Sequence, residues 1–403
     1  MRRLLIITTL DFEREPNQRV QVLASLLRPD FDEVVAVYRV QRDPQGPAGD
    51  TIGVLTQRTS RDERDGIVRV AVDPLWNAPR GRDLRYIGFI KEPMDIGGLA
   101  WGVLRHAPGP FDVAIAEGPT EGAAAHLLRA LGRVERIVYD DFDWVPGWHR
   151  RRFRVKALSW LERWAIAGSD RVVSTGQYLA LLRRVQTGRS PVWIPNGTPR
   201  RLRPDESEIS TKDGGDSEPI LLYTGNLHLP YSGLDAVIAA MPAIRSRAPG
   251  TRLIVVGSGS EPDLAAIHGA ITKAHVAGAV ELVGRVQRDE VDQYLRRATI
   301  GMAMFPPSRL RRFAFPYKVI EYMGAGLSVV GTECSETARI IRSHGIGETV
   351  PFEPEAIAGG VSRLLGDTRR RREIAERGYA AAEGYLWERI GDRYREVIHS
   401  LQA

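Results

Sequence analysis

Short apolar runs alternate with longer amphipathic stretches along the first half of the chain. The runs are rich in Val, Ile, Leu and Ala, which is typical of parallel strands that are buried on both faces. They predict strands at 4–9, 33–40, 112–116, 136–139 and 171–174, and the stretches between them predict helices at 17–27, 121–131 and 153–167. This alternation indicates a doubly wound α/β sheet. Residues 41–110 contain many Gly, Pro and Arg residues and show no regular pattern, so no elements are assigned there.

A second alternation follows a polar, aperiodic segment at 198–219, whose Pro, Asp, Ser and Gly residues are typical of a linker. Strands are predicted at 220–224, 252–256, 280–283, 300–304 and 328–331, and helices at 233–248, 263–275, 290–297, 317–323 and 386–401. We therefore expect two Rossmann-like domains that join near residue 210. The expected bounds are 1–205 for the N-terminal domain, 218–385 for the C-terminal domain and 386–403 for a final helical segment.

Composition narrows the class of protein. The 403 residues are 43% hydrophobic and 26% charged, which is typical of a globular protein large enough for two domains. The first apolar stretch covers only residues 4–10 and no small-residue cleavage site follows it, so it predicts a buried strand rather than a signal peptide. No run approaches the ~20 apolar residues that span a bilayer. We expect a cytoplasmic protein, with peripheral contact to the inner membrane face as a further expectation.

Charge and cysteine content narrow the possible ligands. Cys334 is the only cysteine, which excludes an intramolecular disulfide and indicates a reducing compartment. One cysteine and eight scattered histidines give no metal-ligand spacing, so no metal site is predicted. The net charge of +6 suits a protein that handles anions such as nucleotide diphosphates or an acidic lipid surface. Nucleic acid is disfavoured, because no nucleic-acid-binding signature is present.

Residues 315–332 carry the most specific pattern in the chain. Pro316, Lys318 and Glu321 lie at the expected start of a helix, glycines close it, and a β-branched strand follows. Lys318 and Glu321 are three positions apart and so share one helical face, near a terminus that favours anions. Such a group can hold a phosphorylated polyol, with the lysine on phosphate and the carboxylate on ribose hydroxyls. The alternative is an ordinary surface helix with an ion pair between the two side chains.

This segment resembles the donor-sugar signature of nucleotide-sugar glycosyltransferases of the two-domain GT-B type, family 4. The family pattern P-x-K-x-x-E-Y-M-x-x-G-x-P-V-V is matched from Pro316 to Val330, except that Ser328 replaces the usual proline. The resemblance implies two Rossmann-like domains facing across a cleft, a final helix that returns to the first domain, and a retaining, metal-independent reaction. It also implies a nucleotide-diphosphate-sugar donor, UDP- or GDP-linked, as co-substrate and no other cofactor. The donor-binding residues it implies are Gly225, Asn226, Gly257, Arg285, Val286, Phe315, Pro316, Lys318 and Glu321, with Lys318 also catalytic.

Three further positions depart from the commoner family pattern. Asn226 and Ser232 replace an arginine and a lysine that contact the diphosphate in many members, and Phe313 replaces a glutamate that contacts the donor sugar. Lys318 must therefore supply the cationic contact. Whether Arg309, Arg311 or Arg312 assists it, or whether these three belong to a solvated loop, stays open.

In the first half, the segment after the strand at 136–139 supplies the candidates for acid–base chemistry. Asp141 and Asp143 are candidate catalytic bases, although Asp143 can instead cap a helix, and Phe142 stands where the family often has histidine. Glu162 and Arg163 are expected to form a structural ion pair. The candidate acceptor-binding residues are Asn17, Arg19, Glu117 and Trp144, with Glu121 beside Glu117 and an aromatic and cationic rim at 144–152. This rim can bind an acceptor, contact an anionic membrane, or be a plain basic helix start.

The expected function is retaining transfer of a sugar, of the hexosyltransferase type, from a nucleotide-diphosphate donor to a small-molecule or glycan acceptor. Specialised-metabolite or cell-envelope glycoside biosynthesis is the expected setting. Two alternatives stay open: a nucleotide-binding, non-catalytic protein on the same fold, and a sugar-nucleotide epimerase. The identity of the donor base, the acceptor and the oligomeric state do not follow from the sequence.

Overall fold

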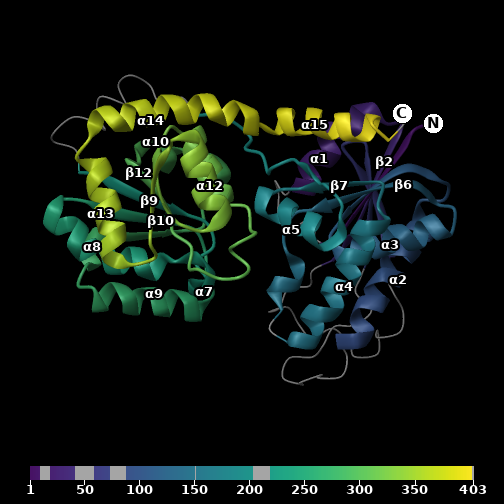
Figure 1. Cartoon of the computed structure of the whole chain (residues 1–403), viewed down its shortest axis with the longest axis horizontal. Coiled ribbons are helices and arrows are strands. Elements are labelled where there is room, and N and C mark those ends of the chain that lie inside the picture. Colours follow the sequence, from purple (N-terminus) through teal and green to yellow (C-terminus); the bar gives the residue numbers. More distant parts are fainter. Residues whose placement is uncertain (10–18, 41–58, 73–87, 150, 203–217, 402–403) are drawn as a thin grey trace. The chain divides into compact units, whose positions relative to one another are not determined.

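The computed structural model describes residues 1–9, 19–40, 59–72, 88–149, 151–202 and 218–401 (Figure 1). The chain forms two compact units. Unit 1 contains Met1–Pro195 and Ile390–Ala403, and unit 2 contains Asn196–Arg389. Each unit is built around its own largely parallel sheet, which confirms the predicted α/β fold class.

The sheet of unit 1 has eight strands in the order β3-β4-β2-β1-β5-β6-β7-β8. All neighbours pair in parallel except β3 and β4. The strands are β1 (Arg3–Thr8), β2 (Glu33–Arg39), β3 (Thr59–Arg64), β4 (Ile67–Val72), β5 (Phe111–Glu117), β6 (Val134–Asp141), β7 (Arg171–Ser174) and β8 (Val192–Trp193). The central strands are almost fully buried, as their apolar runs predict.

The β3–β4 hairpin lies in the stretch that the sequence analysis left unassigned. Its two-residue turn is Asp65–Gly66, and both residues have positive φ angles, 56° and 70°. An Asp-Gly turn with this geometry matches the right-handed twist of a hairpin. The edge strand β3 is polar at nearly every position, so it lacks the apolar run by which the other strands were found.

The helices of unit 1 divide between the two faces of the sheet. They are α1 (Arg19–Leu27), α2 (Gly88–His106), α3 (Pro119–Ala130), α4 (Arg152–Gly168), α5 (Gln177–Thr187) and the second part of α15 (Trp387–His399). Figure 1 shows α1 and the end of α15 on one side of the sheet and α2, α3 and α4 on the other. The core beneath α2 and α3 includes Leu99, Val103 and Leu128 against Val37, and every one of these side chains is at most 1% exposed.

Arg19 ties the carboxyl end of β6 to the C-terminal helix inside unit 1. Its guanidinium pairs with the Asp140 carboxylate at 2.9 Å and donates to the Ile194 and Pro195 carbonyls and to the Tyr394 hydroxyl. Burial disfavours its charge, but the Asp140 carboxylate outweighs this and raises the pKa of Arg19 above its usual value. Arg19 is therefore a structural residue of unit 1.

Arg183 on α5 forms a second buried centre. Its guanidinium binds both oxygens of Asp141 at 2.8 Å and donates to the Glu162 carboxylate at 2.6 Å, and all three side chains are at most 1% exposed. The ion pair predicted between Glu162 and Arg163 was therefore wrong, because Glu162 turns inward to Arg183. Arg163 instead donates to the Ser159 carbonyl, one helical turn away.

Unit 2 contains a six-stranded parallel sheet in the order β11-β10-β9-β12-β13-β14. Its strands are β9 (Ile220–Thr224), β10 (Arg252–Val256), β11 (Val280–Gly284), β12 (Ile300–Ala303), β13 (Ser328–Thr332) and β14 (Gly347–Val350). Its helices are α7 (Leu229–Ser232), α8 (Leu234–Arg247), α9 (Glu261–Lys273), α10 (Arg288–Arg297), α11 (Tyr317–Gly324), α12 (Ser335–His344), α13 (Pro354–Leu365), α14 (Thr368–Ala381) and the first residues of α15. This order is that of a dinucleotide-type doubly wound sheet.

Replacing Arg183 by Met should destabilise the protein by roughly 3–5 kcal/mol, because the buried Asp141 and Glu162 carboxyl groups lose the guanidinium that donates to both. The measurement is the free energy of unfolding in denaturant. Arg184→Met is the matched control: Arg184 is the next residue and is exposed, so the expected change is within about 0.5 kcal/mol. A loss below about 1 kcal/mol for Arg183→Met would contradict the assignment.

Glu162 should make the stability depend on pH, because burial raises its pKa from 4.5 to about 8. Between these values the folded protein binds a proton that the unfolded chain does not, so the free energy of unfolding falls as pH rises. Glu162→Gln keeps an oxygen that accepts from Arg183 and removes the titrating group. We expect its stability to change less between about pH 5 and pH 8 than that of the parent, and parallel curves would exclude this role.

Candidate functional site

The order of strands in unit 2 reverses between β9 and β12. The connections that follow β9 and β12 run in opposite directions from this point. The loops beyond the carboxyl ends of the two strands therefore flank a crevice, and in doubly wound sheets ligands bind in that crevice. The loop after β9 contains Gly225 and Asn226, and the segment after β12 leads into α11, which carries Lys318 and Glu321. The structure therefore brings the two sequence motifs to one edge of the sheet.

The glycine loops after β9 and β10 are packed against each other. Gly225 donates its amide to the Val256 carbonyl, and Leu227 donates to the Ser258 carbonyl at 3.0 Å. A Cβ atom at Gly257 would lie 1.8 Å from the Gly225 carbonyl oxygen, so no other residue fits there. Gly225 itself has a φ of 117°, a backbone conformation that side chains rarely adopt. The glycines are required by this close packing, independently of any ligand.

Lys318 lies under the Gly225 loop. Its ammonium is 3.5 Å from the centre of the Tyr223 ring and 5.2 Å from that of Phe305, and a Cβ atom at Gly225 would be 3.8 Å from it. Within the described residues it makes no hydrogen bond or ion pair, although an ammonium has three N–H donors. Burial, aided by the nearby Arg311 cation, lowers the pKa of Lys318 well below its usual value. An anion bound beside this amine would therefore favour its charged form.

Glu321 pairs with Arg288 and not with Lys318. Arg288, at the start of α10, donates through Nη1 to Glu321 Oε1, and the Glu321 side chain is 7% exposed. The surface ion pair between Lys318 and Glu321, the simpler alternative from the sequence, is thus absent from this part of the chain. Arg288 was not among the candidates, because the two residues are 33 positions apart and no motif links them.

The start of α11 offers fewer amides than its sequence suggested. Tyr317 donates its amide to the Phe315 carbonyl, and Val319 donates to the Pro316 carbonyl. Phe315 and Pro316 thus shape the turn that leads into the helix. Their predicted contact with a donor stays a prediction.

The positions that depart from the family pattern have structural tasks. The Asn226 side chain accepts from the His228 amide at 2.7 Å, and its carbonyl accepts from the Tyr223 hydroxyl. Ser232 is 2% exposed, so its side chain is not accessible to a diphosphate. Arg311 donates to the Tyr231 carbonyl and lies over the Phe305 ring.

The remaining predicted residues of this half are exposed or half-buried. Arg309 and Arg312 are exposed. Arg285 is exposed and Val286 half-buried just beyond β11, at the same edge of the sheet as Gly257. Their predicted roles at the donor stay predictions.

His228 and Asp263 form a polar pair that the sequence analysis missed. His228 Nδ1 lies 2.8 Å from Asp263 Oδ1, and the other Asp263 oxygen accepts from the Ser260 hydroxyl and amide. Hydrogen bonds from Ser260 and His228 lower the pKa of Asp263 to about 2. The pair fixes the loop after β9 to the start of α9. The contact between Asp263 and Ser260 could have been predicted from the sequence, because Ser-x-x-Asp is a capping-box pattern.

In unit 1 the two candidate bases are committed to other contacts. Asp141 is fully buried in its ion pair with Arg183, so the prediction that it acts as a catalytic base is corrected. Asp143 accepts from the Trp144 amide at 2.7 Å and from the Trp148 indole at 3.1 Å. It therefore orders the turn before α4. This role is local and resembles the helix capping that the sequence offered as the alternative to catalysis.

Two of the candidate acceptor contacts have interior positions. Arg19 is 6% exposed and bound to Asp140, which corrects its predicted contact with an acceptor. Trp144 is 7% exposed and packs over Gly147, which leaves little of the ring for a ligand. Asn17 lies outside the described residues.

Glu117 and Glu121 lie where the strand order of unit 1 reverses, between β1 and β5. Glu117 accepts from the Thr8 hydroxyl at 2.7 Å, and a Cβ atom at Gly118 would lie 3.0 Å from a Glu121 carboxylate oxygen. Both side chains are nearly fully buried. Burial raises the pKa of Glu121 to about 7 and that of Glu117 well above its usual value. The strand-order reversal of unit 1 thus carries two carboxyl groups whose protonated form is favoured by burial. Their predicted place near the acceptor stays a prediction.

Two features are absent from the described residues. In that part of the chain, no three His, Cys, Asp or Glu side chains converge as metal ligands would. Nor does any of its helices combine the length and apolar content needed to cross a membrane.

Comparison with known proteins gives matches to glycosyltransferases. Residues 218–367 match the family described as glycosyl transferases group 1. The phosphatidyl-myo-inositol mannosyltransferase of Mycobacterium tuberculosis H37Rv is 25% identical over 224 residues, which cover 53% of this chain and 55% of that protein. The enzyme of the same name from Propionibacterium freudenreichii is 25% identical over 287 residues, 70% of this chain and 68% of that one. The chain thus spans about half the length of the mycobacterial relatives that it matches.

Solved structures show the same fold over the whole chain. Sucrose-phosphate synthase from Thermosynechococcus elongatus superposes with a TM-score of 0.72 at 17% identity and covers 100% of this chain and 99% of its own. Anabaena HepE, in complex with UDP and glucose, gives a TM-score of 0.72 at 16% identity and covers 99% of this chain and 100% of its own. The predicted resemblance to glycosyltransferases of the GT-B, family 4 type is confirmed, since the family model matches unit 2 and the fold is shared.

Proposed function

We propose that this protein transfers a sugar from a nucleotide-diphosphate donor to an acceptor with retention of anomeric configuration. The observation that carries the proposal is the Lys318 ammonium, which lies beside Gly225 without an oxygen partner among the described residues. A diphosphate that is bound over the Gly225 loop would supply that partner. In this arrangement Glu321, oriented by Arg288, accepts hydrogen bonds from the donor's hydroxyl groups.

The chemistry follows from where charge develops. When the bond between the sugar and the diphosphate breaks, negative charge grows on the leaving phosphate, and a preorganised cation stabilises it. Asp141 is buried in its contact with Arg183, and Asp143 accepts hydrogen bonds from Trp144 and Trp148, so the proposal uses neither as the acceptor's base. The proposal therefore has the leaving diphosphate accept or orient the acceptor proton on the same face, which gives retention. Lys318 is its catalytic residue.

Relatives support the nucleotide-sugar class. The Anabaena structure holds UDP-glucose in a further complex, and a relative from Mycolicibacterium smegmatis, 26% identical over 220 residues, is named a GDP-mannose-dependent mannosyltransferase. These names favour UDP or GDP as the nucleotide of the donor and a cell-envelope glycoside as the product. A specialised-metabolite glycoside is the second candidate, since the altered positions Asn226, Ser232 and Phe313 suggest an unusual donor or acceptor.

Nucleotide binding is the first test. Thermal unfolding with UDP, GDP, ADP, TDP and CDP should show a rise in Tm for one or two of them, because a ligand that binds only the folded state stabilises it. Isothermal calorimetry then gives the Kd. If none of the five nucleotides shifts the transition, the proposed donor class is wrong. If one nucleotide binds but its sugar is neither transferred nor hydrolysed, the non-catalytic alternative is favoured, and interconversion of the free donor favours the epimerase.

Replacing Lys318 by Met should have opposite effects on binding and on stability. The Kd of the preferred nucleotide should rise about 30- to 1000-fold, because the diphosphate loses its buried counterion, an effect of roughly 2–4 kcal/mol. The ligand-free protein should become more stable, because folding disfavours the charged lysine and so lowers its pKa.

Lys273→Met is the matched control, since Lys273 is exposed in the last turn of α9 and should change neither quantity appreciably. A Kd change below about threefold for Lys318→Met would remove the lysine from the binding site. A fall in ligand-free stability would instead show that the contact with Tyr223 is its main role.

A further inference from the structure

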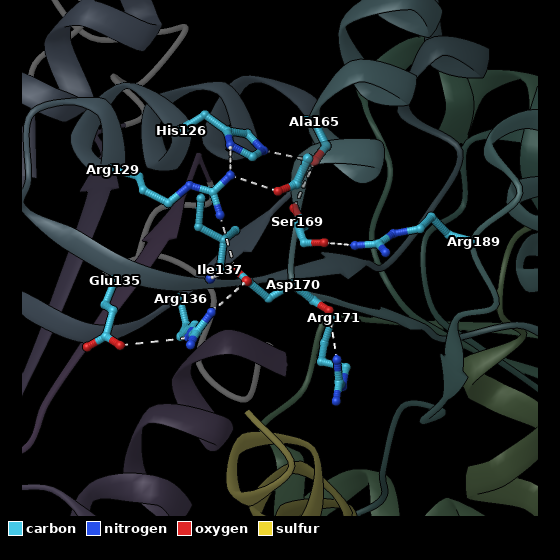
Figure 2. Close-up of polar contacts among 11 residues, drawn as sticks. His126, Arg129, Glu135, Arg136, Ile137, Ala165, Ser169, Asp170, Arg171 and Arg189 are labelled. Atoms are coloured by element: carbon cyan, nitrogen blue, oxygen red, sulfur yellow. Dashed lines mark hydrogen bonds and ion pairs between the residues drawn. The ribbon is translucent and has the colours of Figure 1, made fainter. Parts of the chain in front are cut away.

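Two histidines of the described chain are held in contrasting ways. His126 on α3 uses both ring nitrogens inside unit 1 (Figure 2): Nε2 donates to the Ala165 carbonyl at 2.9 Å, and Nδ1 accepts from Arg129 at 3.1 Å. Burial lowers the pKa of His126, which keeps its ring neutral. His228 in unit 2 makes its one hydrogen bond within the described residues through Nδ1, which lies 2.8 Å from Asp263 Oδ1. His126 is therefore structural, whereas His228 keeps a ring nitrogen for another partner.

Asp263 fixes the orientation of the His228 ring. The Asp263 side chain is 13% exposed, and its second oxygen accepts from the Ser260 hydroxyl and amide. Because these contacts lower its pKa to about 2, the carboxylate is ionised at neutral pH and can only accept hydrogen bonds. Nδ1 of His228 therefore carries a hydrogen and donates it to Asp263. A carboxylate that holds one nitrogen of a histidine in this way presents the other nitrogen to a ligand.

The His228 ring is open to solvent. Its side chain is 44% exposed, and its ring lies beside Tyr231 of α7, with ring centres 5.2 Å apart. Nε2 has no hydrogen-bond partner in the part of the chain that the structure describes. The nearby start of α9 offers little to a ligand, because its capping box uses the Asp263 amide and Pro262 has no N–H group. The His228 side chain, rather than the helix end, is therefore the group that a ligand can contact here.

His228 belongs to the loop that carries the proposed donor site. It follows Gly225 by three positions, and its amide donates to the Asn226 side chain at 2.7 Å. The Lys318 amine lies beside the same glycine. A diphosphate that is linked to a sugar carries negative charge on each of its phosphates, and a single lysine neutralises only part of it. The loop after β9 thus combines a diphosphate that needs a second cationic donor with a histidine whose outer nitrogen is open to solvent.

We propose that His228, held by Asp263, is a second phosphate-binding residue of the donor site, an inference that rests on the proposed sugar transfer and extends it. When the donor binds, the ring takes a proton from solvent, so that Nδ1 donates to Asp263 and Nε2 donates to a phosphate oxygen. Asp263 of α9 and Tyr231 of α7 are the titratable groups that face the ring. The diphosphate is then bound by Lys318 on α11 and by His228 in the loop after β9.

Calorimetry on the full chain tests this role, with whichever of UDP, GDP, ADP, TDP and CDP raises the Tm. His228→Asn keeps an amide that can donate to Asp263 but has no counterpart of Nε2, so the Kd should rise about tenfold. His228→Gln places a neutral amide near the position of Nε2 and should recover part of the affinity. His268→Asn is the matched control, because His268 is exposed on α9, and it should leave the Kd unchanged.

Proton uptake separates a phosphate contact from a structural role. Titrations in two buffers of different ionisation enthalpy, at about pH 8 where free imidazole is mostly neutral, count the protons that bind with the nucleotide. The parent and His268→Asn should take up more protons than His228→Asn or His228→Gln, because neither of these two variants has an imidazole to protonate at this position. If His228→Asn is unfolded at the temperature of the titration, the proton count of His228→Gln decides.

Two results would overturn the role of His228 alone. One is a Kd change below about threefold for His228→Asn in a protein whose nucleotide binding Lys318→Met does weaken. The other is equal proton uptake by the parent and the His228 variants. In either case the donor site would stand, and His228 would only fix the loop to α9. Failure of the parent to bind any of the five nucleotides would instead overturn the sugar-transfer proposal and this inference together.

Discussion

The ammonium of Lys318 is held over an aromatic ring with no oxygen within hydrogen-bonding reach among the described residues. A ring face attracts a cation, but it does not replace the hydrogen bonds that water gives to three N–H groups. Folding therefore keeps this charge in a position that the ligand-free protein stabilises poorly. The Gly225 and Gly257 loops maintain that position, because their contact leaves no room for a side chain between them. The proposed donor site depends on this combination of a fixed loop and an incompletely solvated cation.

In unit 1, buried charged groups are instead paired with one another inside the protein. At the end of β6, Asp140 pairs with Arg19 on α1, and Asp141 pairs with Arg183 on α5. These pairs connect α1, α5 and the C-terminal helix to the sheet, so charge burial there orders the unit rather than binding a ligand. Glu117 and Glu121 form no ion pair with an arginine in the described structure, and burial raises the pKa of both carboxyl groups instead. Buried carboxylates alone therefore did not distinguish a catalytic site from a structural one.

The sequence predicted those features that local pattern determines. The strands Ile220–Thr224, Arg252–Val256 and Arg171–Ser174 were found at their observed bounds, because each is a short apolar run with polar flanks. The polar β3 strand was missed, since only its pairing with β4 makes it a strand. The role of Asp141 was misjudged because its partner Arg183 lies 42 positions away, and Arg288 was overlooked for the same reason. Charge pairs across helices require the tertiary structure, whereas the Lys318 motif is contiguous and could be found without it.

The two units differ in what their outer helices expose, although both have doubly wound sheets of related strand order. In the described part of unit 2 no large hydrophobic side chain is exposed, and on the amphipathic helix α10 Arg288 pairs with Glu321 and Asp289 pairs with Arg200. The helices α2–α5 instead turn their carboxylates inward and their indoles outward. Two sheets of related strand order therefore carry outer helices with different surfaces, so the fold alone does not determine which side chains these helices expose.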